Sequence, residues 1–393
     1  PHAIYQADNW HELTSMGKER LIGLDILRGF AVTTVFIAHI LLFIPKDFFI
    51  QIHSITWRVT YLANYSVDCF FALSGFLIGG SLLDYEKYDF KSLYNYSIDR
   101  ITKIFPCYHI IFIMTASAYI IFGYTYPLSY LLFIQAYTND LYFIGVAWTL
   151  SIEIFSYILM PFFLYIFKFK IKLLNNSYIN IMLFIFIFIL IESVFRYLSA
   201  LNTPNIVLDD AIRKMPHLRM DALFYGLCIS CARKAFPVIY NKMASPIVFI
   251  VIILAISIFL EWQYSDSFIQ NTELEKNKDI QSLIGFSLSG VLSAAILPFL
   301  SKTTLNTEKL CKIKSFFLYM SKISYPFYLV HLQVLSLFIS IYYKIDISNI
   351  YLKHVLFIFM VIISIKVTFL TSSLLHKYIE NPSIRLRKKI KIS

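Results

Sequence analysis

Charged residues are scarce in this chain of 393 residues: they make up 15% of it, against about 25% in an ordinary soluble domain. Hydrophobic residues make up 58%, and the mean hydropathy is +0.66. Five cysteines provide no disulfide framework. Cys228 and Cys231 lack the second ligand pair that a structural zinc site needs, so we expect no metal. The sequence also contains no HExxH, P-loop or GxSxG motif and no internal repeat. These features exclude a soluble domain and the best-known hydrolase and nucleotidase signatures.

Long apolar runs recur along the chain and predict an all-α, polytopic membrane protein with about ten transmembrane helices. Arg219 and Asp221 interrupt the sixth of these spans. The apolar run at 127–136 is too short to cross a bilayer and predicts a re-entrant or interfacial piece. The predicted spans are 24–45, 58–83, 104–123, 144–168, 178–199, 217–232, 246–261, 281–300, 318–342 and 353–375.

Lys and Arg gather in alternate connecting segments, as the positive-inside rule requires. The rule predicts that both termini lie in the cytoplasm. No connecting segment is long enough for a soluble domain, and the N-terminus does not resemble a cleavable signal peptide. We therefore divide the chain into an N-terminal tail (1–23), a transmembrane domain (24–376) and a basic C-terminal tail (377–393). The net charge of +11 is spread over many short loops, which argues against nucleic-acid binding.

Arg28 and His39 both lie in the first apolar run, where ionisable side chains are costly and usually functional. Eleven residues are close to three helical turns, so both side chains share one helix face, about 16 Å apart along the axis. Asp25 lies one turn from Arg28. Taken alone, Arg28 could be a snorkelling membrane anchor and His39 an interhelical hydrogen-bonding group. Their common face favours a functional pair: a cation that holds an anion near one surface, and a titratable group deeper in the membrane.

Five short elements resemble, in the right order, the acyltransferase-3 family of integral membrane acyltransferases. Lys103 stands where that family usually has Arg, and Ile154 follows Glu153 where a second acidic residue is common. The elements are LDILRGFA at 24–31 with His39, FFALSGFL at 70–77, RITKIFP at 100–106, WTLSIE at 148–153 and ISYPFYLVH at 323–331.

The resemblance implies transfer of an acyl group, usually acetyl from cytoplasmic acetyl-CoA, to a hydroxyl of a glycan or lipid-linked sugar. In bacterial relatives the acceptor is O-antigen of lipopolysaccharide, capsule or exopolysaccharide, and the enzyme spans the cytoplasmic membrane, in contact with its lipids. Such a reaction needs a base for the hydroxyl proton, and histidine has the pKa nearest neutrality. We therefore assign His39 and Glu153 as catalytic residues, and Arg28, Arg100 and Lys103 as the cations that bind CoA.

Eight further polar or aromatic residues are candidates for acceptor binding or structure. Glu153 and Asp68 could each orient His39 or pair with an Arg, whereas Arg219 and Asp221 are expected to pair with each other near the outer surface. His331 is the second choice for a catalytic or acceptor-binding group, with a core histidine as the alternative. Tyr108 and Trp148 are expected to be interfacial aromatics rather than catalytic groups. The eight are Asp25, Asp68, Ser74, Tyr108, Trp148, Arg219, Asp221 and His331.

Other functions remain compatible with a polytopic membrane protein. A secondary transporter or flippase for a lipid-linked sugar would use the buried charges as a proton relay, but the inverted repeats that it predicts are not evident. A non-catalytic scaffold or sensor gives no reason for Asp25, Arg28 and His39 to share one span. A different membrane acyltransferase fold would also use a buried histidine.

Overall fold

The computed structural model of the chain describes residues 21–45, 52–85, 87–138, 140–170, 174–201, 209–269, 284–303 and 311–391. Nearly all of these residues are helical, and none forms a β-strand, which confirms the all-α prediction. Most of the N-terminal tail and of the segment 262–280 lies outside the described residues. The α-helices are α1 (Ile22–Leu42), α2 (Ile52–Leu83), α3 (Phe90–Ile121), α4 (Trp148–Tyr165), α5 (Ser177–Leu201), α6 (Asp221–Ala235), α7 (Pro237–Met243), α8 (Pro246–Ile269), α10 (Phe286–Ala295), α11 (Leu297–Lys302), α12 (Cys311–Lys344), α13 (Ile350–Leu375) and α14 (Asn381–Ile390).

Within the described part of the chain, 8 helical segments are long and apolar enough to cross a membrane. The predicted sixth and eighth spans are shorter: the sixth folds as α6, which begins only at Asp221, and the eighth as α10 followed by α11. The predicted number of about ten transmembrane helices therefore includes two helical segments that are shorter than the other eight. The run at 127–136 forms two short 3₁₀ helices, Leu128–Leu132 and Gln135–Tyr137.

Local signals explain where several helices begin. The Asp89 carboxylate accepts a hydrogen bond from the Ser92 amide (2.8 Å) and caps α3. Asn349 caps α13 in the same way, through the amides of Tyr351 and Leu352. Pro237 occupies the first turn of α7, where its missing N–H costs no hydrogen bond.

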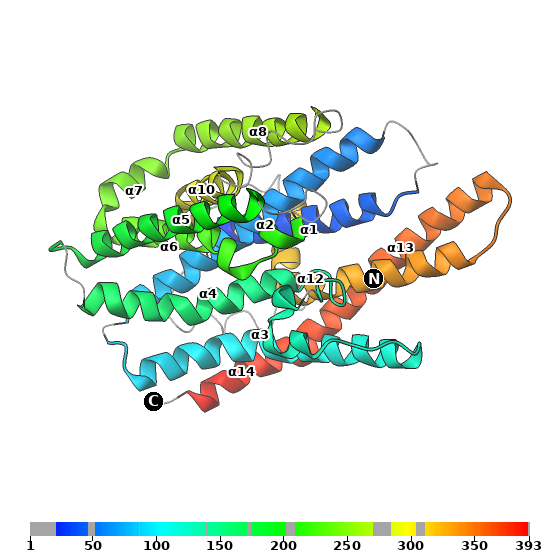
Figure 1. Cartoon of the computed structure of the whole chain (residues 1–393), viewed down its shortest axis with the longest axis horizontal. Helices are drawn as coiled ribbons and strands as arrows, with labels where there is room; N and C mark the ends of the chain where they lie inside the picture. Colours follow the sequence, from blue (N-terminus) through cyan, green and yellow to red (C-terminus); the bar gives the residue numbers. More distant parts are fainter. Residues whose placement is uncertain are drawn as a thin grey trace.

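The long helices run side by side along the long axis of the molecule (Figure 1). Helix α1 packs between α2 and α12, and α2 also packs along α6. Gly75 permits the last of these contacts, because a Cβ at that position would lie 1.8 Å from the carbonyl oxygen of Leu223. The LSGF element at 73–76 thus has a packing role, which is to bring α2 and α6 into backbone contact.

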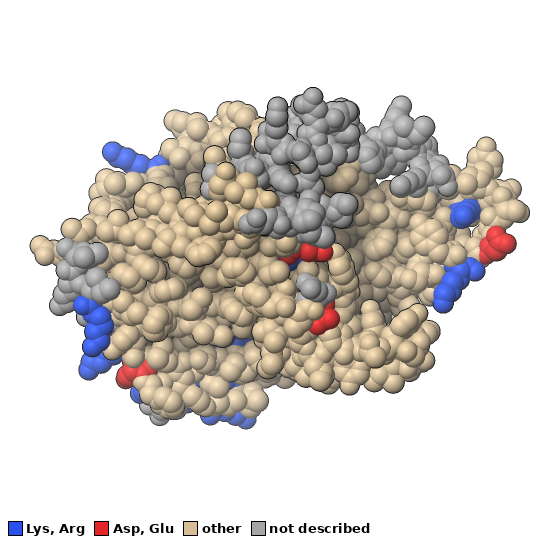
Figure 2. Space-filling view, viewed as in Figure 1, with Lys and Arg blue, Asp and Glu red and all other residues tan. Residues whose placement is uncertain are grey.

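The outer surface is largely apolar. Side chains such as Phe186 on α5, Val251 on α8 and Val355 on α13 are more than half exposed. Figure 2 shows one such face, on which most visible Lys and Arg side chains lie toward the ends of the long axis and the lower rim. A water-soluble monomer would not expose so much apolar surface, whereas a bilayer requires it.

Candidate active site

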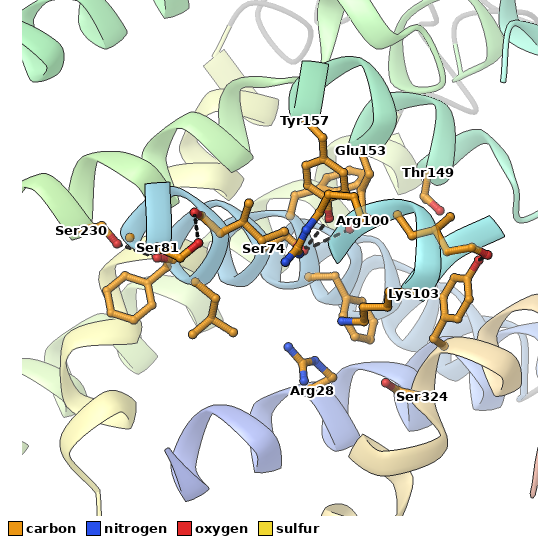
Figure 3. Close-up of a pocket in the computed structure, with 18 of the residues that line it drawn as sticks. Arg28, Ser74, Ser81, Arg100, Lys103, Thr149, Glu153, Tyr157, Ser230 and Ser324 are labelled. Atoms are coloured by element: carbon orange, nitrogen blue, oxygen red, sulfur yellow. Dashed lines mark hydrogen bonds between the residues drawn. The ribbon is translucent and has the colours of Figure 1, made fainter. Parts of the chain in front are cut away.

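A cavity of about 820 Å³ runs along α2 between α1, α3, α4, α6 and α12. Three cations line its inner part: Arg28 from α1, and Arg100 and Lys103 from α3. We refer to these three as the inner cations. Figure 3 shows Arg28 on one side of the cavity and Arg100 opposite it, near Ser74. The three residues that the sequence assigned to CoA binding thus line one space, and we name it the first cavity.

The inner cations make few contacts with the protein itself. Arg28 lies 3.8 Å from Asp25, one turn earlier on α1. The guanidinium of Arg100 lies 5.8 Å from the centre of the Tyr96 ring. Among the described residues, no hydrogen bond or ion pair joins the side chain of Arg100 or Lys103 to another group. Cationic donors that converge on one cavity and have few partners in the protein suit an anionic ligand.

Glu153 lies in the first cavity with the inner cations, not beside His39. Its carboxylate accepts a hydrogen bond from the Ser74 hydroxyl (3.1 Å). The Tyr157 hydroxyl in turn lies 3.5 Å from Ser74 (Figure 3). Glu153 therefore shares the cavity of Arg100 and Lys103, and the structure gives it no contact with His39.

His39 lines a second cavity, of about 570 Å³. Its other walls carry the aromatic side chains of Trp57, Tyr61 and Trp148, and the polar groups of Asn64 and Arg213. None of the inner cations lines this second cavity, and His39 does not line the first. One face of α1 thus lines both cavities: Arg28 lines the first cavity and His39 lines the second.

Two residues, Val67 of α2 and Tyr328 of α12, line both cavities. We refer to this point as the junction. Val67 is buried, and the Tyr328 ring lies 5.7 Å from the His331 ring, centre to centre. The two cavities therefore adjoin at Val67 and Tyr328.

The two candidate histidines are in contact, although 292 residues separate them in sequence. Nε2 of His331 lies 3.1 Å from Nδ1 of His39. Nδ1 of His331 lies 3.2 Å from the Phe327 carbonyl oxygen, which can only accept, so in the neutral ring Nδ1 carries the proton and Nε2 accepts. Nδ1 of His39 must then be the donor, shared with the Val35 carbonyl oxygen at 2.9 Å. This assignment leaves Nε2 of neutral His39 with a free lone pair for a substrate proton.

A family model described as an acyltransferase domain matches residues 21–373, which is most of the chain. The protein belongs to the acyltransferase-3 family. Neither the curated proteins nor the solved structures contain a match to it. The match confirms the family that the five sequence elements indicated, and the helical fold agrees with a membrane acyltransferase.

The acyltransferase pairs its buried charges differently from the sequence prediction. Arg219 and Asp221 do not pair with each other: Arg219 binds Asp68 of α2, and Asp221 binds Arg196 of α5 (2.5 Å). Arg219 precedes α6 and Asp221 is the first residue of α6, and each side chain finds its partner on another helix. Ser289 also donates to Asp68 (2.6 Å). These buried pairs hold α2, α5 and α10 around the start of α6.

Two aromatic residues also differ from the interfacial positions expected for them. Tyr108 is fully buried, and its hydroxyl donates to the Tyr130 carbonyl oxygen (2.8 Å), so it is a core residue. Trp148 is buried against the second cavity, where the Arg213 guanidinium lies 5.0 Å above its ring.

Arg213 is a site residue that the sequence analysis missed. It belongs to the π-helical turn Asp209–Arg213, between α5 and α6, and it binds the Asn64 side chain of α2. In the same turn Asp210 accepts from Lys214 and Tyr142 (2.5 Å each). Burial raises the pKa of the Asp210 carboxyl, but these two donors outweigh burial and hold the pKa below its usual value. The turn is therefore anchored above the second cavity at neutral pH.

Proposed function

We propose that this acyltransferase moves an acetyl group from acetyl-CoA to a hydroxyl of a cell-envelope glycan, such as O-antigen of lipopolysaccharide, capsule or exopolysaccharide, in the inner membrane of a bacterium. One observation carries the proposal: a cation-lined cavity and a histidine-lined cavity meet at Val67 and Tyr328. The first suits a polyanionic thioester donor, and the second suits a sugar hydroxyl. We infer that the two substrates enter separately and react at the junction.

The charge of the first cavity and the order of its lining residues support CoA as the donor. CoA carries its phosphates at one end and a neutral pantetheine arm at the other. The inner cations would hold the phosphates, because charge-assisted hydrogen bonds to phosphate are among the strongest that a protein makes. Beyond them the cavity wall is formed by Phe70, Phe71 and Leu150 up to the junction. This neutral stretch suits the arm, which would bring the thioester toward His39.

His39 would act as the general base. Its Nε2 takes the proton of the acceptor hydroxyl while the hydroxyl oxygen attacks the thioester carbonyl carbon. A new C–O bond forms and the C–S bond breaks, and the leaving CoA thiolate takes the proton from the His39 imidazolium, which returns the base to its neutral form. Nδ1–H of the resulting imidazolium points at Nε2 of His331, which stabilises the charge through a hydrogen bond.

The acceptor would occupy the second cavity. Aromatic rings such as Trp57, Tyr61 and Trp148 offer flat apolar faces of the kind on which sugar rings stack, and Asn64 and Arg213 offer donors for hydroxyl or acidic groups. Glu153 belongs to the donor side in this scheme. There it balances the charge of Arg100 and Lys103 when no phosphate is bound.

The test combines cells and purified protein. Cells that lack the gene are complemented with the wild type, His39→Ala or His109→Ala, and the O-acetyl esters of the envelope glycans are quantified after release by mild base. His109 is the matched control, because it is a histidine of a spanning helix that lines neither cavity. We expect His39→Ala to bind acetyl-CoA in calorimetry but to restore no ester. Normal ester content with His39→Ala, or no binding of acetyl-CoA to the wild type, would contradict the proposal.

A further inference from the structure

The first cavity carries a second group of cations, farther from the junction. Arg233 and Lys234, near the C-terminal end of α6, both line it. We refer to them as the outer cations. Ser81 and Ser230 lie beside one another at this end of the cavity, well away from Lys103 and Thr149 (Figure 3).

Positions along α2 give the spacing of the two groups. Ser74 lies near Arg100 (Figure 3), and Ser81 follows seven residues later, one turn before Asp84, the ion-pair partner of Lys234. Seven residues of helix span about 10 Å. Val67, at the junction, precedes Ser74 by another seven residues, which adds about 10 Å. Along its length the cavity is thus cationic at the mouth, cationic again in the middle and neutral at the junction.

The outer cations differ in their contacts with the protein. Lys234 forms an ion pair with Asp84 (2.5 Å). Arg233 is exposed, and within the described residues no hydrogen bond or ion pair involves its side chain. The hydroxyl groups of Ser81 and Ser230 donate to the carbonyl oxygens of Ile78 (2.9 Å) and Phe76 (2.6 Å), so their oxygens remain able to accept but not to donate to a phosphate. Arg233 is therefore the donor that can bind an anion at the mouth without breaking a contact.

We propose that Arg233, assisted by Lys234, binds the 3′-phosphate on the ribose of CoA. The inference rests on the proposed function and specifies which end of the donor each group of cations holds. CoA has two anionic groups, a diphosphate between the pantetheine arm and the nucleoside, and a 3′-phosphate beyond it on the ribose. The cavity has the same order: the outer cations would face the 3′-phosphate, the inner cations the diphosphate, and the neutral stretch the pantetheine arm. The enzyme therefore selects CoA over dephospho-CoA, which lacks only the 3′-phosphate.

The test compares these two ligands on the purified full chain. Binding of CoA and of dephospho-CoA is measured by calorimetry for the wild type, Arg233→Ala, Asp84→Asn and Lys242→Ala. Lys242 is the matched control, because it is an exposed cation of the neighbouring helix α7 that lines neither cavity. A charge-assisted hydrogen bond to phosphate corresponds to about a tenfold change in Kd or more.

We expect the wild type and Lys242→Ala to bind CoA about tenfold more tightly than dephospho-CoA. Arg233→Ala should bind both ligands with the affinity of the wild type for dephospho-CoA. Asp84→Asn should strengthen CoA binding alone, because it releases Lys234. Full preference for CoA in Arg233→Ala, or no preference in the wild type, would overturn the assignment of the outer cations while leaving CoA as the donor. Binding of neither ligand would instead refute the proposed function itself, and this inference with it.

Discussion

Replacement of His331 tests the contact between the two histidines. His331→Phe keeps a ring of similar size in a fully buried site but removes the nitrogen that accepts from His39. In the resting enzyme the contact between His39 and His331 is one hydrogen bond between neutral groups. During the reaction His39 becomes an imidazolium, and the same bond becomes charge-assisted, with a contribution of about 1.5–3 kcal/mol. Only the difference between the charge-assisted and the neutral bond, about 1–1.5 kcal/mol, affects kcat, so the loss of this bond should lower kcat by about tenfold.

The size of the effect separates a positioning residue from the base. Removal of the general base itself, in His39→Ala, should cost about 10²–10⁴-fold. His331→Gln should recover part of the activity, because its side-chain oxygen can accept from Nδ1 of His39. Since neither histidine lines the first cavity, acetyl-CoA should bind all three variants normally.

The assay is the O-acetyl ester content of the envelope glycans per unit of enzyme in the membrane, with calorimetry of acetyl-CoA on the purified variants. Two results would refute the reasoning. Wild-type activity in His331→Phe would show that the contact is only structural. A loss in His331→Phe and His331→Gln that exceeds the loss in His39→Ala would make the later histidine the base.

Further predictions concern the donor cavity, the junction and the buried charges. Lys103→Met and Arg100→Met should each raise the Kd of acetyl-CoA about tenfold, measured by calorimetry, and unchanged affinity in both would remove the inner cations from the donor site. Val67→Phe should abolish ester formation without weakening CoA binding, because the larger ring closes the junction; normal turnover would show that the acyl group takes another route. Asp68→Asn should leave Arg219 with an unpaired buried charge, which costs about 3–5 kcal/mol; thermal unfolding should show a markedly lower Tm, and an unchanged Tm would contradict this account.

Features that depend on one helix or on loop charge could be predicted from the sequence. The common face of Arg28 and His39 follows from helical periodicity, and in the structure that face lines the two cavities. The sequence analysis grouped Arg28, Arg100 and Lys103 as CoA-binding cations, and in the structure the three line one cavity. The CoA-binding role of these residues stays a prediction.

Features that depend on contacts between distant helices could not be predicted. Nothing in the periodicity of either span indicates that His39 meets His331. No motif of the sequence marked Arg233 and Lys234, because the fold of α6 against α2 is what brings them to the cavity that Arg28 lines. Arg213 lies in a short turn without apolar periodicity, so no pattern marked it.

The close approach of α1 and α12 explains why His39 can donate a hydrogen bond to His331. A Cβ at Gly29 would lie 2.0 Å from the carbonyl oxygen of Phe317, so a residue with a side chain would force the two helices apart. The same pair of helices carries His39 and His331 farther along, where the imidazole centres are 5.0 Å apart. Arg28 precedes this glycine directly, on the face that lines the first cavity. One tightly packed helix thus fixes both the cation at the donor cavity and the imidazole at the acceptor cavity, so that the separation between phosphate site and base is set by a rigid element rather than by a loop.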